Sequence, residues 1–304
     1  MLYQLHKSKK NNAPYLLMLP GVACGGFVFE EALPSLVPSF NVVLFNNPGT
    51  GGAPLSGDMS VYDLAHQALG VMDELGVTTF HVCGHSMGGF VAQRMALEAP
   101  ERIMRMALMS TSYGGMQTER DTKRIMHDFV HHMQMFHDLY HKHPEKVLDV
   151  MVAPEFAAKH PERIKAMAAL FDSHKIDPRA VAAHFMCGAR FSAFGEVDKL
   201  RLPTLIIHGA VDSVVSVHGA RALARHIAGA RYLELKSGGH VPFIESPDVI
   251  PTIVAFLSGK GADIGEDLGQ AAPPGVAEVM ADSMWRAGQQ SVSGLRSLME
   301  MFSP

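Results

Sequence analysis

The sequence predicts an α/β fold in which helices cover both faces of a mostly parallel, twisted sheet, with a helical insertion and a C-terminal helical extension. Two observations predict this class. Short apolar runs alternate with segments of helical periodicity between residues 15 and 110, which is the pattern of a parallel sheet built from strand–helix–strand units. The alternation stops near residue 114 and resumes near residue 204, so a helical segment divides the sheet-forming sequence into two parts.

The first two strands are expected at residues 15–19 and 42–45, where apolar runs are followed by Pro-Gly turns. Their continuous apolar character indicates burial on both faces. A helix then follows: Ser60 and Asp63 have the spacing of a capping box, an apolar stripe recurs at helical intervals, and Gly76 ends the pattern.

Residues 84–89, Gly-His-Ser-Met-Gly-Gly, follow an apolar run at 79–83 and precede a helical pattern at 90–97. A Gly-x-Ser-x-Gly stretch between a strand and a helix is typical of a serine held on a sharp turn as a nucleophile. Glycine is needed on both sides because the strand and the helix approach too closely for a Cβ atom. A serine directly before a helix can instead be an N-cap. Partners elsewhere in the chain therefore decide the role of Ser86.

The remaining strands are expected at residues 103–109, 204–208 and 231–235, and the last helix of the core at 249–257. No convincing strand occurs between residues 114 and 199, where the sequence is rich in methionine, histidine and phenylalanine. A Gly/Ala/Pro-rich stretch after residue 258 indicates a linker. We therefore expect a core at 1–113 and 200–258, a helical lid at 114–199, a linker at 259–275 and a C-terminal amphipathic helix at 276–304.

The composition narrows the function classes. The 304 residues are 47% apolar and 18% charged, with a formal net charge of −4. We expect a large core and no nucleic-acid partner, since a nucleic-acid surface needs clustered Lys and Arg. No apolar run reaches the length of a membrane span, and the polar start lacks the apolar region of a signal peptide. The sequence thus predicts a cytoplasmic protein without a transmembrane segment.

Two further residues complete a possible catalytic set. A serine hydroxyl needs a base, and the base needs an orienting carboxylate. Asp212 follows the predicted strand at 204–208, and His240 lies in a Gly-rich loop after the strand at 231–235. Both would lie at the carboxyl edge of the sheet, beside the predicted serine turn. The alternatives are a turn or cap role for Asp212 and a structural role for His240, with His208 and His218 as rival histidines.

Three stretches of this sequence resemble the α/β-hydrolase superfamily, and the resemblance spans most of residues 14–257. They are the Gly-His-Ser-Met-Gly-Gly turn, Pro-Thr-Leu-Ile-Ile-His-Gly-x-x-Asp and Gly-Gly-His-Val-Pro-Phe-Ile-Glu-Ser-Pro. With a single predicted lid, the chain is most similar to small capped serine hydrolases such as carboxylesterases and enol-lactonases. The resemblance implies Ser86 as nucleophile, His240 as general base and Asp212 as its orienter.

An oxyanion hole needs two preorganised N–H donors. We expect the backbone N–H of Met87, at the start of the helix, and that of Val22, in the loop after the first buried strand. Relatives usually have His-Gly-x in that loop, whereas this chain has Pro20-Gly21-Val22. Backbone donors do not require the histidine, so both donors are retained.

The predicted function is therefore a cofactor-independent serine hydrolase without a metal, acting on a small to medium apolar ester, lactone or related carbonyl compound. Acyl transfer, thioester hydrolysis, carbon–carbon bond cleavage and perhydrolysis use the same residues and stay open. The His127/His131 and His137/His141 pairs have metal-ligand spacing but no accompanying carboxylates, so a solvated helix face is favoured.

A function of another class also stays open: a non-catalytic binding or scaffold protein that uses the C-terminal helix. Within residues 276–304, apolar residues recur at near-helical spacing. This segment is expected to dock on the body of the protein or to self-associate. A protein partner or a membrane surface is less favoured, and basic residues are too sparse there for binding to anionic lipid.

Overall fold

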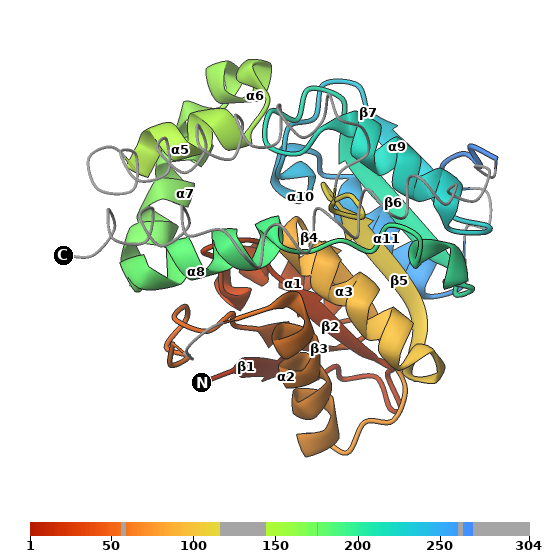
Figure 1. The fold of residues 1–304 in the computed structure, drawn as a ribbon. Helices are drawn as coiled ribbons and strands as arrows, with labels where there is room; N and C mark the ends of the chain where they lie inside the picture. The colour runs from red at the N-terminus through yellow and green to blue at the C-terminus, as the bar shows by residue number, and fades with distance from the viewer. Residues whose placement is uncertain (56–58, 116–143, 175, 261–263, 270–304) are drawn as a thin grey trace, which may run out of the picture.

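The computed structural model describes residues 1–55, 59–115, 144–174, 176–260 and 264–269. Within them, seven strands form one sheet in the order β1-β3-β2-β4-β5-β6-β7 (Figure 1). Only β1 runs antiparallel to its neighbour. The predicted fold class is confirmed. The strands are β1 (Tyr3–His6), β2 (Tyr15–Leu19), β3 (Asn41–Phe45), β4 (Phe80–His85), β5 (Ile103–Met109), β6 (Thr204–Gly209) and β7 (Arg231–Leu235).

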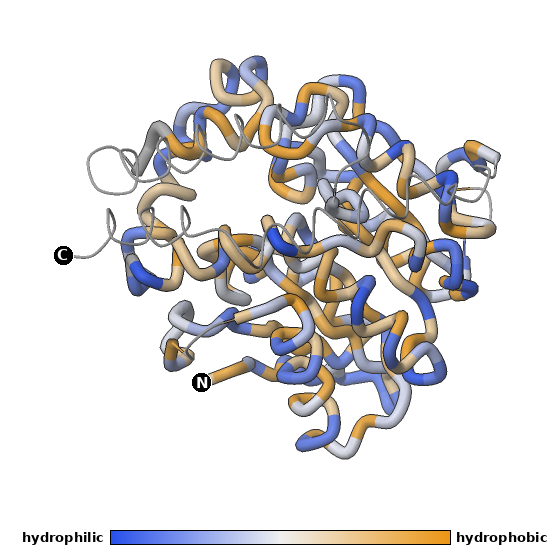
Figure 2. Tube along the Cα trace, in the orientation of Figure 1, coloured by the Kyte–Doolittle hydropathy of each residue, from blue (hydrophilic) through white to orange (hydrophobic). Residues whose placement is uncertain are grey.

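Alternate residues of each central strand face opposite helical layers, as the period of two in a strand requires. Leu17 and Val43 pack in the cluster formed with α2 (Val61–Glu74), α3 (Met87–Glu98) and α9 (Val217–His226). Leu16 and Val42 pack in the cluster on the other face, with η1 (Gly26–Ala32), α1 (Leu33–Leu36) and α11 (Val249–Leu257). Figure 2 shows the apolar residues concentrated along the strands and the inward sides of these helices.

Local signals predicted several of these elements closely. The capping box of α2 is present, with Ser60 and Asp63 each accepting a hydrogen bond from the other's backbone N–H. The last core helix, α11, has the predicted bounds. Strand β1 was not predicted, because its four residues are all half-buried at the sheet edge and show no apolar run.

The chain between β5 and β6 contains the helices of the described part of residues 114–199, here called the inserted segment. They are α5 (Pro144–Met151), α6 (Pro154–Lys159), α7 (Pro161–Ser173) and α8 (Pro178–Ala189). Figure 1 shows α5 to α7 lying apart from the sheet, whereas α8 lies near the start of α3. Leu148, Val152, Ile164 and Met167 form an apolar cluster of their own with Val241. Its role as a lid stays a prediction, and the histidine pairs between 127 and 141 lie outside the described residues.

The structure describes only residues 264–269 of the region beyond residue 260. They are attached to the sheet: Glu266 and Tyr232 exchange two backbone hydrogen bonds of 2.8 Å, and Arg231 donates to the carbonyl of Ile264. This part of the predicted linker therefore packs on β7. The predicted helix at 276–304 lies outside the described residues.

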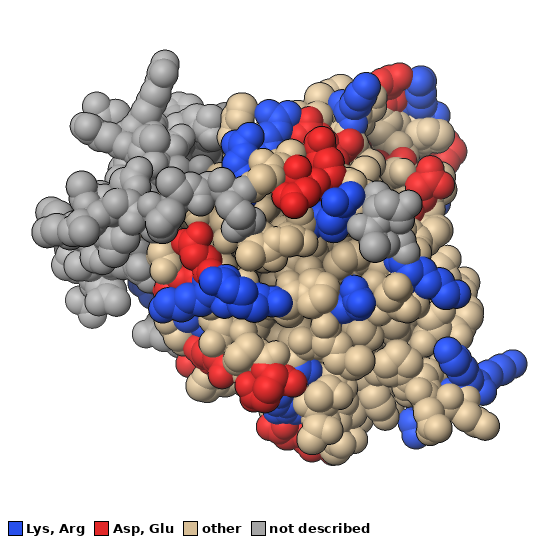
Figure 3. All heavy atoms as spheres, turned by 90° about the vertical axis from the view of Figure 1, so that its right-hand side faces the viewer, with Lys and Arg blue, Asp and Glu red and all other residues tan. Residues whose placement is uncertain are grey.

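Basic and acidic side chains are interspersed on the face drawn in Figure 3. Arg221 and Glu234, for example, form a two-pronged ion pair between α9 and β7. Among the described residues, none of the helices combines the length and the apolar character needed to cross a bilayer.

Candidate active site

The site begins at the turn between β4 and α3. Ser86 has φ 53° and ψ −120°, a strained conformation for a residue with a side chain. A Cβ atom on Gly84 would lie 2.4 Å from the carbonyl oxygen of Gly88, and one on Gly88 would lie 2.1 Å from the carbonyl oxygen of Leu19. The two glycines are therefore what allows the turn to close against the sheet.

Ser86 occupies the N-cap position of α3, but its side chain makes no capping hydrogen bond. Its backbone carbonyl accepts from the N–H of Gly89 and from the hydroxyl of Thr111, both at 2.9 Å. These bonds fix the main chain and leave the hydroxyl unused for the helix. The N-cap role considered from the sequence is thus not the role of this side chain.

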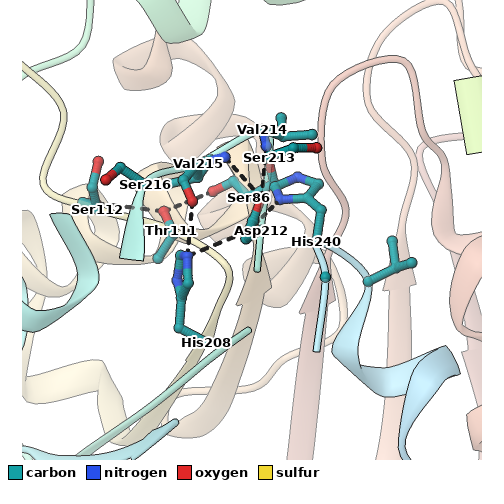
Figure 4. A network of polar contacts seen from close by, with 12 residues as sticks. Ser86, Thr111, Ser112, His208, Asp212, Ser213, Val214, Val215, Ser216 and His240 are labelled. Carbon is teal, nitrogen blue, oxygen red and sulfur yellow. Dashed lines mark hydrogen bonds and ion pairs between the residues drawn. The ribbon is translucent and has the colours of Figure 1, made fainter. Parts of the chain in front are cut away.

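Asp212 lies just beyond β6, and its side chain is fully buried. Its Oδ1 accepts from the N–H groups of Val214 and Val215 at 2.8 and 2.9 Å. Its Oδ2 lies 2.9 Å from Nδ1 of His240 and 3.3 Å from Nε2 of His208 (Figure 4). Four nitrogen atoms therefore surround the carboxylate, two beside each oxygen.

This environment keeps Asp212 ionised. Burial alone would raise the pKa of its carboxyl group, but the charge of His240 and the hydrogen bonds from His208 and His240 outweigh it. The pKa of Asp212 therefore lies below its usual range. A buried carboxylate that stays charged can stabilise an imidazolium beside it.

His240 lies in the loop after β7, and its ring is almost fully buried. Because Oδ2 of the ionised Asp212 can only accept, Nδ1 of His240 carries the proton and Nε2 keeps its lone pair. The backbone N–H of His240 donates to the carbonyl of Met151, at the end of α5, at 2.7 Å. The inserted segment thus holds the loop that carries this histidine.

Glu245 holds the same loop from the other side. Its carboxylate accepts from the backbone N–H groups of Gly239 and Val241, which flank His240, and from that of Ala153. Burial raises the pKa of Glu245, and the three backbone hydrogen bonds oppose that rise. The sequence analysis assigned no role to this glutamate, although it lies in one of the stretches that carry the resemblance.

His85 joins the serine turn to the histidine loop. Its Nε2 donates to the backbone carbonyl of His240 at 2.8 Å, and the two rings lie with centroids 4.9 Å apart. Burial lowers the pKa of His85 to about 3, so it is a neutral donor at ordinary pH. Within the described residues, Ser86 Oγ makes no hydrogen bond to His240; such contacts are often long in unliganded enzymes.

The loop after β2, which carries Val22, lies against the serine. A Cβ atom on Gly21 would be 3.2 Å from Cβ of Ser86. The Val22 N–H donates to no acceptor among the described residues, and Met87 is the first residue of α3, so its N–H has no intrahelical partner. Both donors proposed from the sequence thus belong to segments that converge on Ser86.

Asn47 holds this loop, a role that the sequence analysis did not identify. Its Nδ2 donates to the carbonyl oxygens of Pro20, Gly21 and Cys24 at 3.3, 2.8 and 3.1 Å. A carboxylate in this position could not donate to any of them.

The two rival histidines, His208 and His218, have other positions in the structure. His208 is buried, and its Nε2 donates to the carbonyl of Val215 and faces Asp212. It therefore accompanies the carboxylate rather than the serine. His218 lies on α9 and is exposed. Among the described residues, no group of three or more His, Cys, Asp or Glu side chains could hold a metal ion.

Comparisons with known proteins agree with this architecture. A family model described as alpha/beta hydrolase fold matches residues 14–147. The chain is 24% identical over 245 residues to the Klebsiella pneumoniae protein named "Putative carbamate hydrolase RutD", covering 80% of this chain and 90% of that protein. It is 26% identical over 267 residues to the pimeloyl-[acyl-carrier protein] methyl ester esterase of Aeromonas hydrophila, covering 81% and 96%. The solved enol-lactonase of Burkholderia xenovorans superposes with a TM-score of 0.71 at 25% identity, covering 84% and 95%.

Proposed function

Because the chain has the α/β-hydrolase fold, we propose that it is a serine hydrolase that cleaves an ester, lactone or related carbonyl compound. Ser86 is the nucleophile, His240 is the general base, and Asp212 orients the ring of His240 and stabilises its imidazolium form. The observation that carries this proposal is the buried Asp212–His240 pair, 2.9 Å apart, at the sheet edge where the strained serine lies.

The geometry supports a two-step reaction through an acyl-enzyme. His240 Nε2 takes the proton of Ser86 as Oγ attacks the carbonyl carbon. The oxyanion accepts hydrogen bonds from the N–H groups of Met87 and Val22. His240 then gives its proton to the leaving alcohol or ring oxygen. In the second step His240 takes a proton from water as the water oxygen attacks the acyl carbon. It then gives this proton to Oγ of Ser86 as the acyl–oxygen bond breaks and the acid leaves.

The substrate class within this reaction is open to direct measurement. The names of the similar proteins include a methyl ester esterase, an enol-lactonase and a carbamate hydrolase. The test is therefore a panel of p-nitrophenyl esters of graded chain length, lactones, acyl thioesters and carbamates. We expect ester or lactone hydrolysis at the highest kcat/KM.

Ser86→Ala should abolish turnover, and a fluorophosphonate probe should label Ser86. Ser237→Ala is the matched control, because this serine is exposed and lies three residues before His240. Undiminished turnover by Ser86→Ala, or labelling at another serine, would disprove the proposed role.

The scaffold alternative has a separate test. Because residues 264–266 pair with β7, the chain should be truncated after residue 269. Loss of a partner or of oligomers with undiminished ester hydrolysis would assign a binding role to the remaining residues without changing the enzymatic one.

A further inference from the structure

Another buried histidine lies close to the site, on helix α8 of the inserted segment. Nδ1 of His184 lies 3.1 Å from the N–H of Ala23, and Nε2 lies 3.0 Å from the carbonyl oxygen of Pro48. The first contact requires a lone pair on Nδ1 and the second a proton on Nε2, so one neutral tautomer satisfies both. The ring is fully buried, and this burial lowers the pKa of His184 to about 4.

The partner of His184 is a strained residue. Ala23 has φ 57° although it is not a glycine, and this left-handed conformation costs roughly 1–2 kcal/mol for a residue with a Cβ. Ala23 is also buried, so its N–H would be costly to leave without an acceptor. The hydrogen bond to His184 therefore keeps the chain in a conformation that it would otherwise tend to leave.

Ala23 directly follows Val22, the proposed oxyanion donor. The peptide plane before Val22 contains both the Gly21 carbonyl and the Val22 N–H, and Asn47 holds that carbonyl at 2.8 Å. The plane after Val22 contains the Ala23 N–H, which His184 holds. The direction of the Val22 N–H is therefore fixed from both sides, by one side chain from the core and one from the inserted segment.

Helix α8 touches the other parts of the same region. A Cβ atom on Gly49 would lie 2.4 Å from Cβ of Ala180, and one on Gly188 would lie 3.9 Å from the side chain of Met87. In addition, the N–H of Asp177 donates to the carbonyl of Gly49 at 3.1 Å. One helix thus packs on the Pro48–Gly49 turn, on the loop of Val22 and on the residue that supplies the second donor.

We propose that His184 is a positioning residue of the oxyanion hole, so that α8 is a fixed part of the catalytic site rather than a cover over it. The inference rests on the proposed function, since Val22 is a donor only if Ser86 attacks a carbonyl. It goes beyond that function by assigning a task to the inserted segment.

Two substitutions separate the two hydrogen bonds of the ring. In His184→Asn the amide oxygen can replace Nδ1 as acceptor for Ala23, but the side chain is too short to reach Pro48. In His184→Gln the amide nitrogen can replace Nε2 as donor to Pro48, but Ala23 loses its acceptor. Removal of a whole oxyanion donor costs about a hundredfold to a thousandfold in kcat. Misdirecting a donor should cost less than removing it. We therefore expect His184→Gln, which misdirects the Val22 N–H, to lower kcat about tenfold or more, with little change in KM.

His184→Asn should stay within about threefold of the wild-type kcat, a small part of the loss expected for a missing donor. Affinity for an alkylboronic acid, which places an oxygen in the oxyanion hole, should fall in parallel with kcat. Equal kcat and equal boronate affinity in the two variants would overturn the proposal, because a purely structural histidine would not distinguish them.

Hydrogen exchange of the peptide covering residues 20–24 measures how firmly the loop is held, and it does not require turnover. Faster exchange in His184→Gln than in His184→Asn is expected, and equal exchange counts against the proposal. If the wild type neither hydrolyses any of the substrates nor binds the boronic acid, the proposed function is refuted. The exchange result would still decide whether His184 holds the loop. Should His184→Gln fold poorly, adding Ala23→Gly removes the strain and should restore folding but not kcat; restored kcat would overturn the inference.

Discussion

Asp212→Asn tests the proposed triad with the smallest change in shape. The structure determines how the new amide must lie. Two backbone N–H groups, from Val214 and Val215, point at Oδ1, so the amide oxygen takes that side. The opposite orientation would leave both N–H groups without an acceptor, at a cost of about 1–3 kcal/mol each. The amide NH₂ group therefore occupies the side of Oδ2 and faces His240 and His208.

A donor in that position reverses the tautomer of His240. Nδ1 must then accept, so the proton moves to Nε2, the atom that should take the proton of Ser86. The ring stays in place but has lost its function as a base. Triads with this defect lose about ten thousandfold in kcat, which corresponds to about 5.4 kcal/mol at about 1.36 kcal/mol per factor of ten.

The assay is hydrolysis of the best p-nitrophenyl ester, with kcat and KM determined separately and Tm measured in parallel. Asp198→Asn is the matched control: Asp198 also pairs with a histidine, His226, at 2.9 Å, but away from the site. We expect it to retain wild-type kcat. A kcat of Asp212→Asn within about tenfold of the wild type, with Tm preserved, would refute the tautomer argument.

Further predictions concern the supports of the site and the stability of the fold. Glu245→Gln leaves one of the backbone N–H groups around His240 without an acceptor, so we expect a loss of about 1–3 kcal/mol in unfolding free energy, read by urea denaturation, and a lower kcat. The pKa values of His85 and His184 are lowered from 6.5 to about 3 and about 4, so the unfolded chain binds more protons in this range and Tm should fall as the pH drops below 6.5; a flat Tm profile would contradict this. His184→Asn should make the fall shallower. Gly88→Ala should prevent folding, because its Cβ would lie 2.1 Å from Leu19 O. Gly70→Ala, with nothing within 4 Å, should raise stability by about 1 kcal/mol.

The parts of the structure that depend on local sequence were predictable. Strands β2 to β6 are largely buried on both faces, and such strands read as continuous apolar runs, whereas β7 is mostly half-buried. The turn at Ser86 was predictable because the close approach of Gly84 to Gly88, which excludes a Cβ atom, lies within five residues, and the capping box of α2 spans only four. The positions of Asp212 and His240 followed from the rule that parallel strands end at one edge.

The supporting residues were not predictable, because their roles arise between distant parts of the chain. His184 is separated from Ala23 by 161 positions and His85 from His240 by 155. Nothing in the local sequence around either histidine indicates these partners. The role of Asn47 also arises at a distance, because it depends on three carbonyl groups that lie 23 to 27 positions earlier in the chain.

The inserted segment is joined to the core beside the residues of the proposed catalytic site. The end of α5 accepts from the hydroxyl of Ser213, next to Asp212, and from the N–H of His240. Helix α8 holds Ala23. Displacing the segment as one body would thus break the supports of the acid, the base and the oxyanion loop together. Among the described residues, we therefore expect movement that admits substrate and preserves the proposed site to occur between these attachments. The turn between α6 and α7 is suited to it, since a cavity of about 420 Å³ and another of about 450 Å³ both reach Phe156 and His160. Hydrogen exchange should therefore be faster at residues 154–162 than at 147–153 or 180–187, and the reverse order would show that the attachments are not retained.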